Sequence, residues 1–279
     1  MKLTSFDCGT FKLDGGAMFG VVPKKIWNKL IPANENNLCT WSMRCLLVET
    51  GNRKILIDCG MGTKQDPKFF SHYEPAGNID IHESLKDLHL KKEEITDVFL
   101  THLHFDHCGG AVEMDANGKL IPTFPNATYW SNEQHFQWAE FPNAREKASF
   151  LKENFIPLRE HGVLKFLKEE EELLPGFSTI LVHGHTESMM LPKLEFDGKT
   201  VVYVADLIPS YAHIPLPYVM GYDVRPLQTL KEKELFLNTA LKNNYHLIFE
   251  HDAQNETCTL QMTEKGIRHN VLGKISDIS

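Results

Sequence analysis

The stretch THLHFDHCGG, residues 101–110, holds three histidines, one aspartate and two glycines within ten positions. It directly follows the apolar run ITDVFL, residues 95–100, which is typical of a buried strand. Imidazole and carboxylate groups are the usual protein ligands of zinc and related first-row ions. The stretch therefore predicts a metal site at a strand end, where Gly109 and Gly110 let the backbone pass closely.

Potential metal ligands follow other predicted strands as well. Four predicted strands end within a few residues of such a ligand, and these ligands are His102, His185, Asp206 and His251. Strand ends are rigid, and loops that leave neighbouring strands converge in space, so ligands far apart in sequence can share one site. The neighbouring His183 and the thiol of Cys108 are expected to be structural.

The order of predicted elements is typical of an α/β protein. Two-residue turns predict hairpins at Gly51-Asn52, Asn117-Gly118 and Asp197-Gly198. Helices are predicted over residues 84–95 and 231–244, and residues 132–172 are expected to be mainly helical with breaks near Pro142 and Pro157. No linker or low-complexity tract interrupts the sequence, so a single domain of residues 1–279 with helices covering its sheets is expected.

Composition narrows the classes of protein that need to be considered. The chain has 279 residues, 42% of them hydrophobic, and a formal net charge of −8, which suits a globular protein and disfavours nucleic acid as a partner. Its six cysteines include no CxxC pair, which is typical of reduced, intracellular proteins. No stretch approaches the roughly 20 apolar residues of a membrane span, and the N-terminus lacks a signal-like apolar core, so a cytoplasmic location without a membrane partner is expected.

The segment HLHFDHCGG resembles the HxHxDH signature of the metallo-β-lactamase superfamily. The downstream segments GHT (residues 184–186), AD (205–206) and EHD (250–252) resemble that family's remaining ligand segments in the same order. The resemblance implies an αββα sandwich, with two mixed β-sheets packed face to face and helices on both outer faces.

The resemblance also implies a dinuclear metal site. One ion would be held by His102, His104 and His185. The second would be held by Asp106, His107 and His251, with Asp206 bridging the two. Asp58, in the IDCG turn, resembles a family aspartate that orients the ligand histidines. Two divalent ions are therefore expected as cofactors; zinc is favoured, and manganese, iron and cobalt accept the same ligands.

The reaction that follows from such a site is hydrolysis. Two cations acidify a shared water, and the resulting hydroxide attacks an ester, lactone or phosphoester centre. Asp106 is expected to orient the hydroxide and to carry its proton to the leaving group. Oxygen-reducing di-iron relatives have a carboxylate where this chain has His104, so hydrolysis is favoured over redox chemistry.

The later segments narrow the substrate. The loop of residues 205–223 together with FEHD resembles the branch of N-acyl homoserine lactone lactonases and methyl-parathion-type hydrolases, which predicts a small-molecule lactone or carboxylic ester as substrate. Several lactonases of that branch have a tyrosine where this chain has Pro209, so that residue's role does not transfer. The residues proposed to contact substrate are Phe19, Trp27, Tyr211, His213 and Tyr222.

Two alternatives stay open from the sequence. An organophosphate phosphotriesterase or aryl esterase would use the same metals, and a non-catalytic metal-binding module would use the same ligands without turnover. The apolar segment GAMFGVVPKKIW, residues 16–27, would either line a pocket for an acyl chain or pack in the core. Its apolar character also favours a homodimer.

Overall fold

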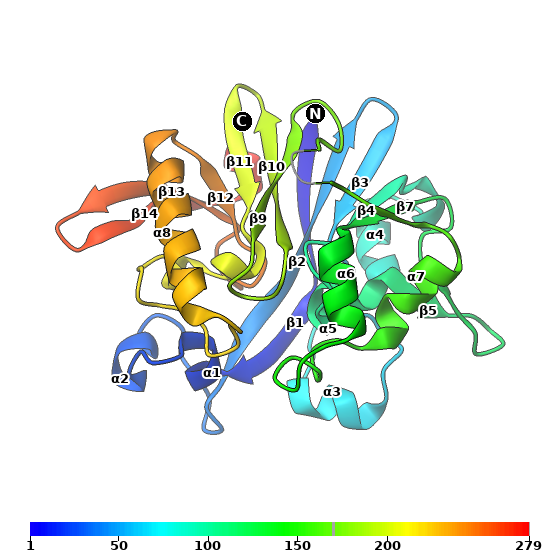
Figure 1. The fold of residues 1–279 in the computed structure, drawn as a ribbon, viewed down its shortest axis with the longest axis horizontal. Helices are drawn as coiled ribbons and strands as arrows, with labels where there is room; N and C mark the ends of the chain where they lie inside the picture. Colours follow the sequence, from blue (N-terminus) through cyan, green and yellow to red (C-terminus); the bar gives the residue numbers. More distant parts are fainter. Residues whose placement is uncertain (169–170, 279) are drawn as a thin grey trace. The chain divides into compact units, whose positions relative to one another are not determined.

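The computed structural model describes residues 1–168 and 171–278, drawn as a ribbon in Figure 1. The chain divides into two compact units. Unit 1 comprises Met1–Phe11 and Met43–Glu171, and unit 2 comprises Lys12–Ser42 and Glu172–Ser279. The single domain of residues 1–279 stays a prediction.

The first sheet has six strands in the order β1-β2-β3-β4-β7-β8. Their bounds are Lys2–Asp14 for β1, Leu38–Thr50 for β2, Arg53–Ile57 for β3, Asp97–Phe99 for β4, Thr128–Ser131 for β7 and Leu164–Phe166 for β8. The sheet is mixed, because β2 pairs antiparallel with β3 whereas β3, β4, β7 and β8 run parallel. The pairing of Thr50 with Arg53 confirms the hairpin predicted at Gly51-Asn52.

Short helices and one small hairpin accompany this sheet in unit 1. The helices are α3 (Pro67–Tyr73), α4 (Ile81–Asp87), α5 (Phe105–Cys108), α6 (Glu133–Glu140) and α7 (Ile156–Glu160). The strands β5 (Val112–Met114) and β6 (Leu120–Pro122) pair antiparallel and confirm the hairpin predicted at Asn117-Gly118.

Two helix predictions in this unit are wrong in their bounds. The helix predicted over residues 84–95 begins at Ile81, because the Asp80 side chain accepts the backbone N–H of His82 at 2.9 Å, and it ends at Asp87. His89 then adopts a left-handed conformation with φ 57°, which no helix continues through.

The stretch of residues 132–172 is mostly not helical. Among the residues of this stretch that the structure describes, only those of α6 and α7 form α-helices, and the strand β8 lies in its second half. Pro157 lies in the first turn of α7, where its missing N–H costs nothing, so it begins a helix and does not break one. Residues 169–170 of the stretch lie outside the described residues.

The second sheet also has six strands, in the order β14-β13-β12-β11-β10-β9. Their bounds are Phe177–Val182 for β9, Met189–Phe196 for β10, Lys199–Tyr203 for β11, His246–Ile248 for β12, Thr257–Thr263 for β13 and Gly266–Gly273 for β14. The pair β11 and β12 is parallel and the other neighbours are antiparallel, so this sheet is mixed too. The pairing of Phe196 with Lys199 confirms the hairpin predicted at Asp197-Gly198.

Three helices belong to unit 2, namely α1 (Gly15–Phe19), α2 (Lys24–Trp27) and α8 (Pro226–Lys242). The long helix α8 packs against β13 and β14, as Figure 1 shows in orange and red. It confirms the helix predicted over residues 231–244, although it begins five residues earlier, with Pro226 in its first turn. The described part of the chain also contains 3₁₀ turns at Lys92–Glu94, Gly109–Ala111, Lys152–Asn154, Ala205–Leu207, Tyr211–His213 and Ile275–Ile278.

The interior of each unit is mainly apolar; β4 is buried throughout, and β3, β11 and β12 are buried in their last two or three residues. All six cysteines lie in the described part of the chain, each as a buried thiol. No helix among the described residues is long and apolar enough to span a membrane.

Candidate metal centre

The four predicted strand-end ligands share one position relative to their strands. Each is the third residue after its strand's last residue: His102 after Phe99, His185 after Val182, Asp206 after Tyr203 and His251 after Ile248. The strands hold these short segments rigidly, since their own last residues are buried. Such platforms position side chains more precisely than long loops do.

In unit 1 the parallel register of β3 and β4 brings Asp58 next to Thr101. Ile57 pairs with Phe99, so the residues that follow the two strands lie side by side. Asp58 accepts the backbone N–H of Thr101 at 2.8 Å through Oδ1 and its hydroxyl at 2.6 Å through Oδ2. Asp58 has a left-handed backbone with φ 56°, a strained conformation that its neighbours must maintain.

The two glycines of the opening stretch are required by close backbone contacts. A Cβ atom on Gly109 would lie 2.1 Å from the carbonyl oxygen of Met61, and one on Gly110 would lie 2.2 Å from that of Cys59. Neither carbonyl can move away cheaply, because both belong to the backbone. The absence of a side chain at both glycines therefore allows the HxHxDH turn to lie in direct backbone contact with the segment that follows Asp58.

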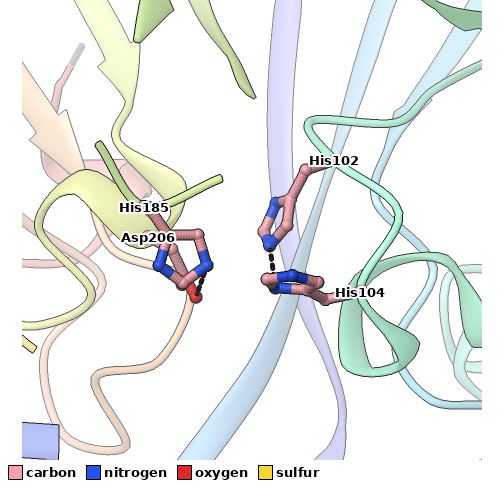
Figure 2. A group of neighbouring side chains, drawn as sticks. All are labelled: His102, His104, His185 and Asp206. Carbon is pink, nitrogen blue, oxygen red and sulfur yellow. Dashed lines mark hydrogen bonds and ion pairs between the residues drawn. The ribbon is translucent and has the colours of Figure 1, made fainter. Parts of the chain in front are cut away.

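His102, His104 and His107 in unit 1 lie close together, and contacts with neighbouring residues orient their rings. Figure 2 shows Nε2 of His102 facing Nδ1 of His104 at 3.0 Å. The outer nitrogen Nδ1 of His102 contacts the Thr101 hydroxyl at 3.1 Å, and Nδ1 of His107 contacts Asp58 Oδ2 at 3.1 Å. These contacts leave Nε2 of His102 and His107 and Nδ1 of His104 directed inward, near the buried Asp106 carboxylate, which lies 3.7 Å from His107 Nε2.

In unit 2 the register of β11 and β12 brings Asp206 next to His251. Tyr203 pairs with Ile248, so the third residues after each strand become neighbours, with His251 Nε2 3.0 Å from Asp206 Oδ1. The other carboxylate oxygen, Oδ2, lies 3.0 Å from His185 Nε2. Figure 2 marks this contact between Asp206 and His185 with a dashed line. A single buried carboxylate thus contacts two imidazoles through two different oxygens.

The outer nitrogens of these two histidines are held as well. Nδ1 of His185 lies 2.9 Å from Asp223 Oδ1, and Nδ1 of His251 lies 2.7 Å from the carbonyl oxygen of Ser42. Contacts of this kind fix the tautomer and the ring orientation of metal-ligating histidines. Asp223, Ser42 and Thr101 were not found from the sequence, because each partner is paired by tertiary contact and carries no local motif.

The electrostatics of unit 2 favour a bound cation. Burial alone would lower the pKa of His185, but the carboxylates of Asp206 and Asp223 outweigh it and raise the pKa to about 10. The buried carboxylates therefore require positive charge beside them. A divalent ion can supply that charge in place of the proton, since metal binding and imidazole protonation compete for one nitrogen. The donor set fits zinc or a similar ion.

Two neighbouring groups lie apart from these ligands. His183 pairs through Nδ1 with Glu187 at 2.9 Å, and Glu187 also binds Arg225 at 2.7 Å. The Cys108 thiol donates to the carbonyl oxygen of Leu103 at 3.3 Å, and burial raises its pKa to about 12, so it stays protonated. Both groups have the structural contacts that were expected of them.

Three of the predicted substrate contacts form one buried stack in unit 2. The ring of Phe19 lies parallel to that of His213 at 4.5 Å on one side and parallel to that of Trp27 at 5.2 Å on the other. All three side chains are buried. The His213 ring also contacts Ser210 Oγ at 2.8 Å and the carbonyl oxygen of Met18 at 2.9 Å, and burial lowers its pKa to about 3. This stack favours the packing alternative for residues 16–27.

The two predicted tyrosines differ in their surroundings. Tyr211 lines a cavity of about 120 Å³ together with Leu30 and Asp252, and its hydroxyl donates to the carbonyl oxygen of Leu30 at 3.1 Å. Its backbone N–H donates to Asp252, the residue after His251. Tyr222 is 38% exposed. Tyr211 is therefore the better placed of the two for contact with a ligand.

Two mixed sheets with buried imidazoles and carboxylates at their strand ends define a metal-dependent hydrolase. Residues 44–238 match the metallo-beta-lactamase superfamily, and the chain belongs to this family. The α/β fold with two mixed sheets confirms the fold class expected from the HxHxDH segment.

Individual relatives agree with this assignment. An N-acyl homoserine lactonase of Bacillus cereus is 25% identical over 244 residues, which is 81% of this chain and 86% of the relative. The crystal structure of a probable metal-dependent hydrolase from Staphylococcus aureus is 27% identical with a TM-score of 0.88, covering 98% of this chain and 96% of that one. AidC, a dizinc quorum-quenching lactonase in complex with N-hexanoyl-homoserine product, is similar in fold with a TM-score of 0.79, 21% identity and coverage of 96% and 93%.

Proposed function

We propose that this hydrolase opens the ring of N-acyl homoserine lactones at a site of two divalent metal ions. The observation that carries the proposal is the donor set, which comprises four ligands in unit 1 and three in unit 2: His102, His104, Asp106, His107, His185, Asp206 and His251. Every one of these side chains is buried or nearly so, and burying that many ionisable groups is costly unless they bind a common charge.

The ligand allocation follows the family pattern. His102, His104 and His185 would hold one ion, and Asp106, His107 and His251 would hold the second, with Asp206 available to both. The outer contacts support the choice of ligand atom, since those nitrogens are already engaged and Nε2 is left for the ion in four of the five histidines. Zinc suits imidazole and carboxylate donors best among the common divalent ions.

The chemistry then divides between the ions and the chain. When bound, two divalent cations acidify water and polarise an ester carbonyl. Asp106 accepts one proton of the attacking water and returns it to the alkoxide that leaves when the ring C–O bond breaks. The products are a free hydroxyl and a carboxylic acid, which loses its proton to solvent at neutral pH and becomes a carboxylate. Asp58 keeps His107 and the Thr101–His102 pair in place throughout, because it contacts both.

The substrate class rests on the relatives. The B. cereus lactonase aligns over 81% of this chain, and AidC is named with an acyl homoserine product. The cavity beside Tyr211 and Asp252 supports a small-molecule ligand, because it combines apolar walls from Leu30, Ile31 and Pro32 with polar groups.

A substrate panel tests the proposal directly. Purified protein with measured metal content is assayed against N-acyl homoserine lactones of several chain lengths, aryl esters, phosphotriesters and β-lactams. We expect close to two ions per chain and the highest kcat/KM on the lactones. A higher kcat/KM on phosphotriesters would indicate a phosphotriesterase. Metal-replete protein that is inactive on the whole panel would indicate a non-catalytic metal-binding module.

Substitution of Asp106 tests the proton transfer. We expect Asp106→Asn to lower kcat about 10²–10⁴-fold, since an amide cannot accept and return a proton. The control is Asp115→Asn, which changes an exposed turn aspartate that accepts the backbone N–H groups of Asn117 and Lys119. Near-normal turnover by Asp106→Asn with full metal content would refute the role of Asp106.

A further inference from the structure

Glu146 is a buried carboxylate that the ligand pattern does not include. Its side chain is only 3% exposed, and Oε1 lies 3.6 Å from Nε2 of His104. The other oxygen, Oε2, accepts from the indole N–H of Trp138 at 2.7 Å and from the amide of Asn143 at 2.6 Å. The carboxylate is therefore oriented so that Oε1 faces the outer side of the His104 ring.

The segment around Glu146 is built onto the HxHxDH turn. The side-chain oxygen of Asn143 accepts the backbone N–H of Glu146 at 3.2 Å, which fixes the start of the segment. Three residues later, the carbonyl oxygen of Ser149 accepts the backbone N–H of Phe105 at 3.0 Å, and the ring of Phe150 packs on His104 with centroids 4.7 Å apart. The segment thus touches the residue after His104 and the His104 ring itself.

The Glu146 carboxylate is buried beside an imidazole that can use its charge. The Trp138 indole and the Asn143 amide, which donate to Oε2, are neutral, and a neutral glutamine would accept from them equally well through its amide oxygen. An imidazole that binds a metal through one nitrogen becomes a stronger donor through the other, and a carboxylate is its usual acceptor. Glu146 Oε1 lies on the Nε2 side of His104, where it can serve as that acceptor.

We propose that Glu146 is a positioning residue, whose Oε1 accepts the Nε2–H of His104 and thereby directs Nδ1 of that ring to the metal ion. The inference rests on the proposed metal-binding function. It accounts for a difference among the five ligand histidines. Four have their outer contact at Nδ1, from Thr101, Asp58, Asp223 and Ser42, whereas His104 has Glu146 on the Nε2 side and presents Nδ1.

Glu146→Gln is the direct test, because the two donors to Oε2 orient the new amide. Its oxygen takes the hydrogen bonds from Trp138 and Asn143, so its NH₂ group faces the Nε2–H of His104, donor against donor. We expect zinc affinity to fall about 10–100-fold and kcat to fall with little change in KM. The visible absorption spectrum of the Co²⁺-substituted protein should also shift, because the ring of one ligand reorients. The metal-free variant should melt within a few degrees of metal-free wild type.

The matched control is Glu140→Gln, which removes a carboxylate paired with Arg159 at the end of the same helix as Trp138. It should keep zinc affinity and the Co²⁺ spectrum. Wild-type affinity and an unchanged spectrum in Glu146→Gln would overturn the inference while the metal site itself stands. A wild-type protein that binds no metal would instead overturn the proposed function.

A second measurement needs no variant. In ¹⁵N-histidine spectra of the zinc-loaded wild type, His104 should show a metal-bound Nδ1 and a proton on Nε2 that exchanges slowly with water, since a carboxylate holds it. A His104 ring bound through Nε2 would contradict the proposal even if Glu146→Gln failed to fold.

Discussion

At the scale of single residues, Lys233 shows how the loop after Asp206 is held. Its side chain is fully buried, and Nζ donates to the carbonyl oxygens of Pro215 at 3.0 Å and Tyr218 at 2.9 Å. Burial lowers the pKa of Lys233 to about 7, with the Asp223 carboxylate opposing that change and Arg268 adding to it. The loop is therefore tied to α8 by a group that titrates near neutral pH.

This pKa predicts a pH dependence of stability with a definite sign. An unfolded lysine has a pKa near 10.4, so between about pH 7 and pH 10 the unfolded chain binds a proton at this site that the folded chain lacks. The Lys233 contribution to the free energy of unfolding should therefore rise with pH across that window. Urea titrations at pH 6.5, 8 and 9.5 measure it, as the difference between wild type and Lys233→Met. A difference that stays constant with pH would contradict the lowered pKa.

The proposed ligand residues carry a signal in the local sequence, whereas the residues that contact them do not. His102, His104, Asp106 and His107 lie in one ten-residue motif, so their chemistry is visible locally. Glu146, by contrast, lies 42 positions beyond His104 in a segment without regular structure. A contact of that kind depends on the packed fold, and a single sequence carries no signal of it.

At the scale of elements, the stack of Phe19, Trp27 and His213 joins the α1–α2 segment to the loop after Asp206. We expect Phe19→Ala to lower the free energy of unfolding by about 3–5 kcal/mol, because it leaves a cavity between two parallel rings. It should leave the ranking of acyl-chain lengths unchanged. Thermal denaturation and the lactone series measure the two effects. The control is Ile26→Ala in α2, because the Ile26 side chain is about half exposed. If Phe19→Ala changed the ranking of acyl-chain lengths, Phe19 would instead be a wall of the substrate pocket.

Elements with strong local signals were predicted and those without were missed. The hairpins depend on two-residue turns, and the turn residues Gly51, Gly118 and Gly198 all have the positive φ that such turns need. The strands β13 and β14 were not predicted, because their sequences TCTLQMT and GIRHNVLG mix polar and apolar residues and most of their side chains are only partly buried. The three-residue strand β8 is too short for any periodicity to show.

At the scale of the whole molecule, the two units hold complementary parts of the proposed ligand set. Removal of metal should therefore destabilise the whole chain. We expect chelation to lower the melting temperature and added zinc to restore it, since a ligand at 1,000 times its Kd stabilises by about 4 kcal/mol. His104→Ala in unit 1 and His251→Ala in unit 2 should each lose most of this zinc-dependent increment. The exposed His72→Ala should keep it, and a full increment in either ligand variant would refute the shared site.

The six buried thiols allow opening of the folded chain to be measured, because each becomes accessible to reagents only when its surroundings unfold. Alkylating reagents react with thiolates, and burial raises the pKa of Cys39 to about 11 and that of Cys108 to about 12, so the folded chain resists labelling. Cys8, Cys45, Cys59 and Cys108 lie in unit 1, and Cys39 and Cys258 lie in unit 2. Mass spectrometry of the labelled peptides over time thus measures the opening rate of each unit separately. Bound zinc should slow thiol labelling in both units.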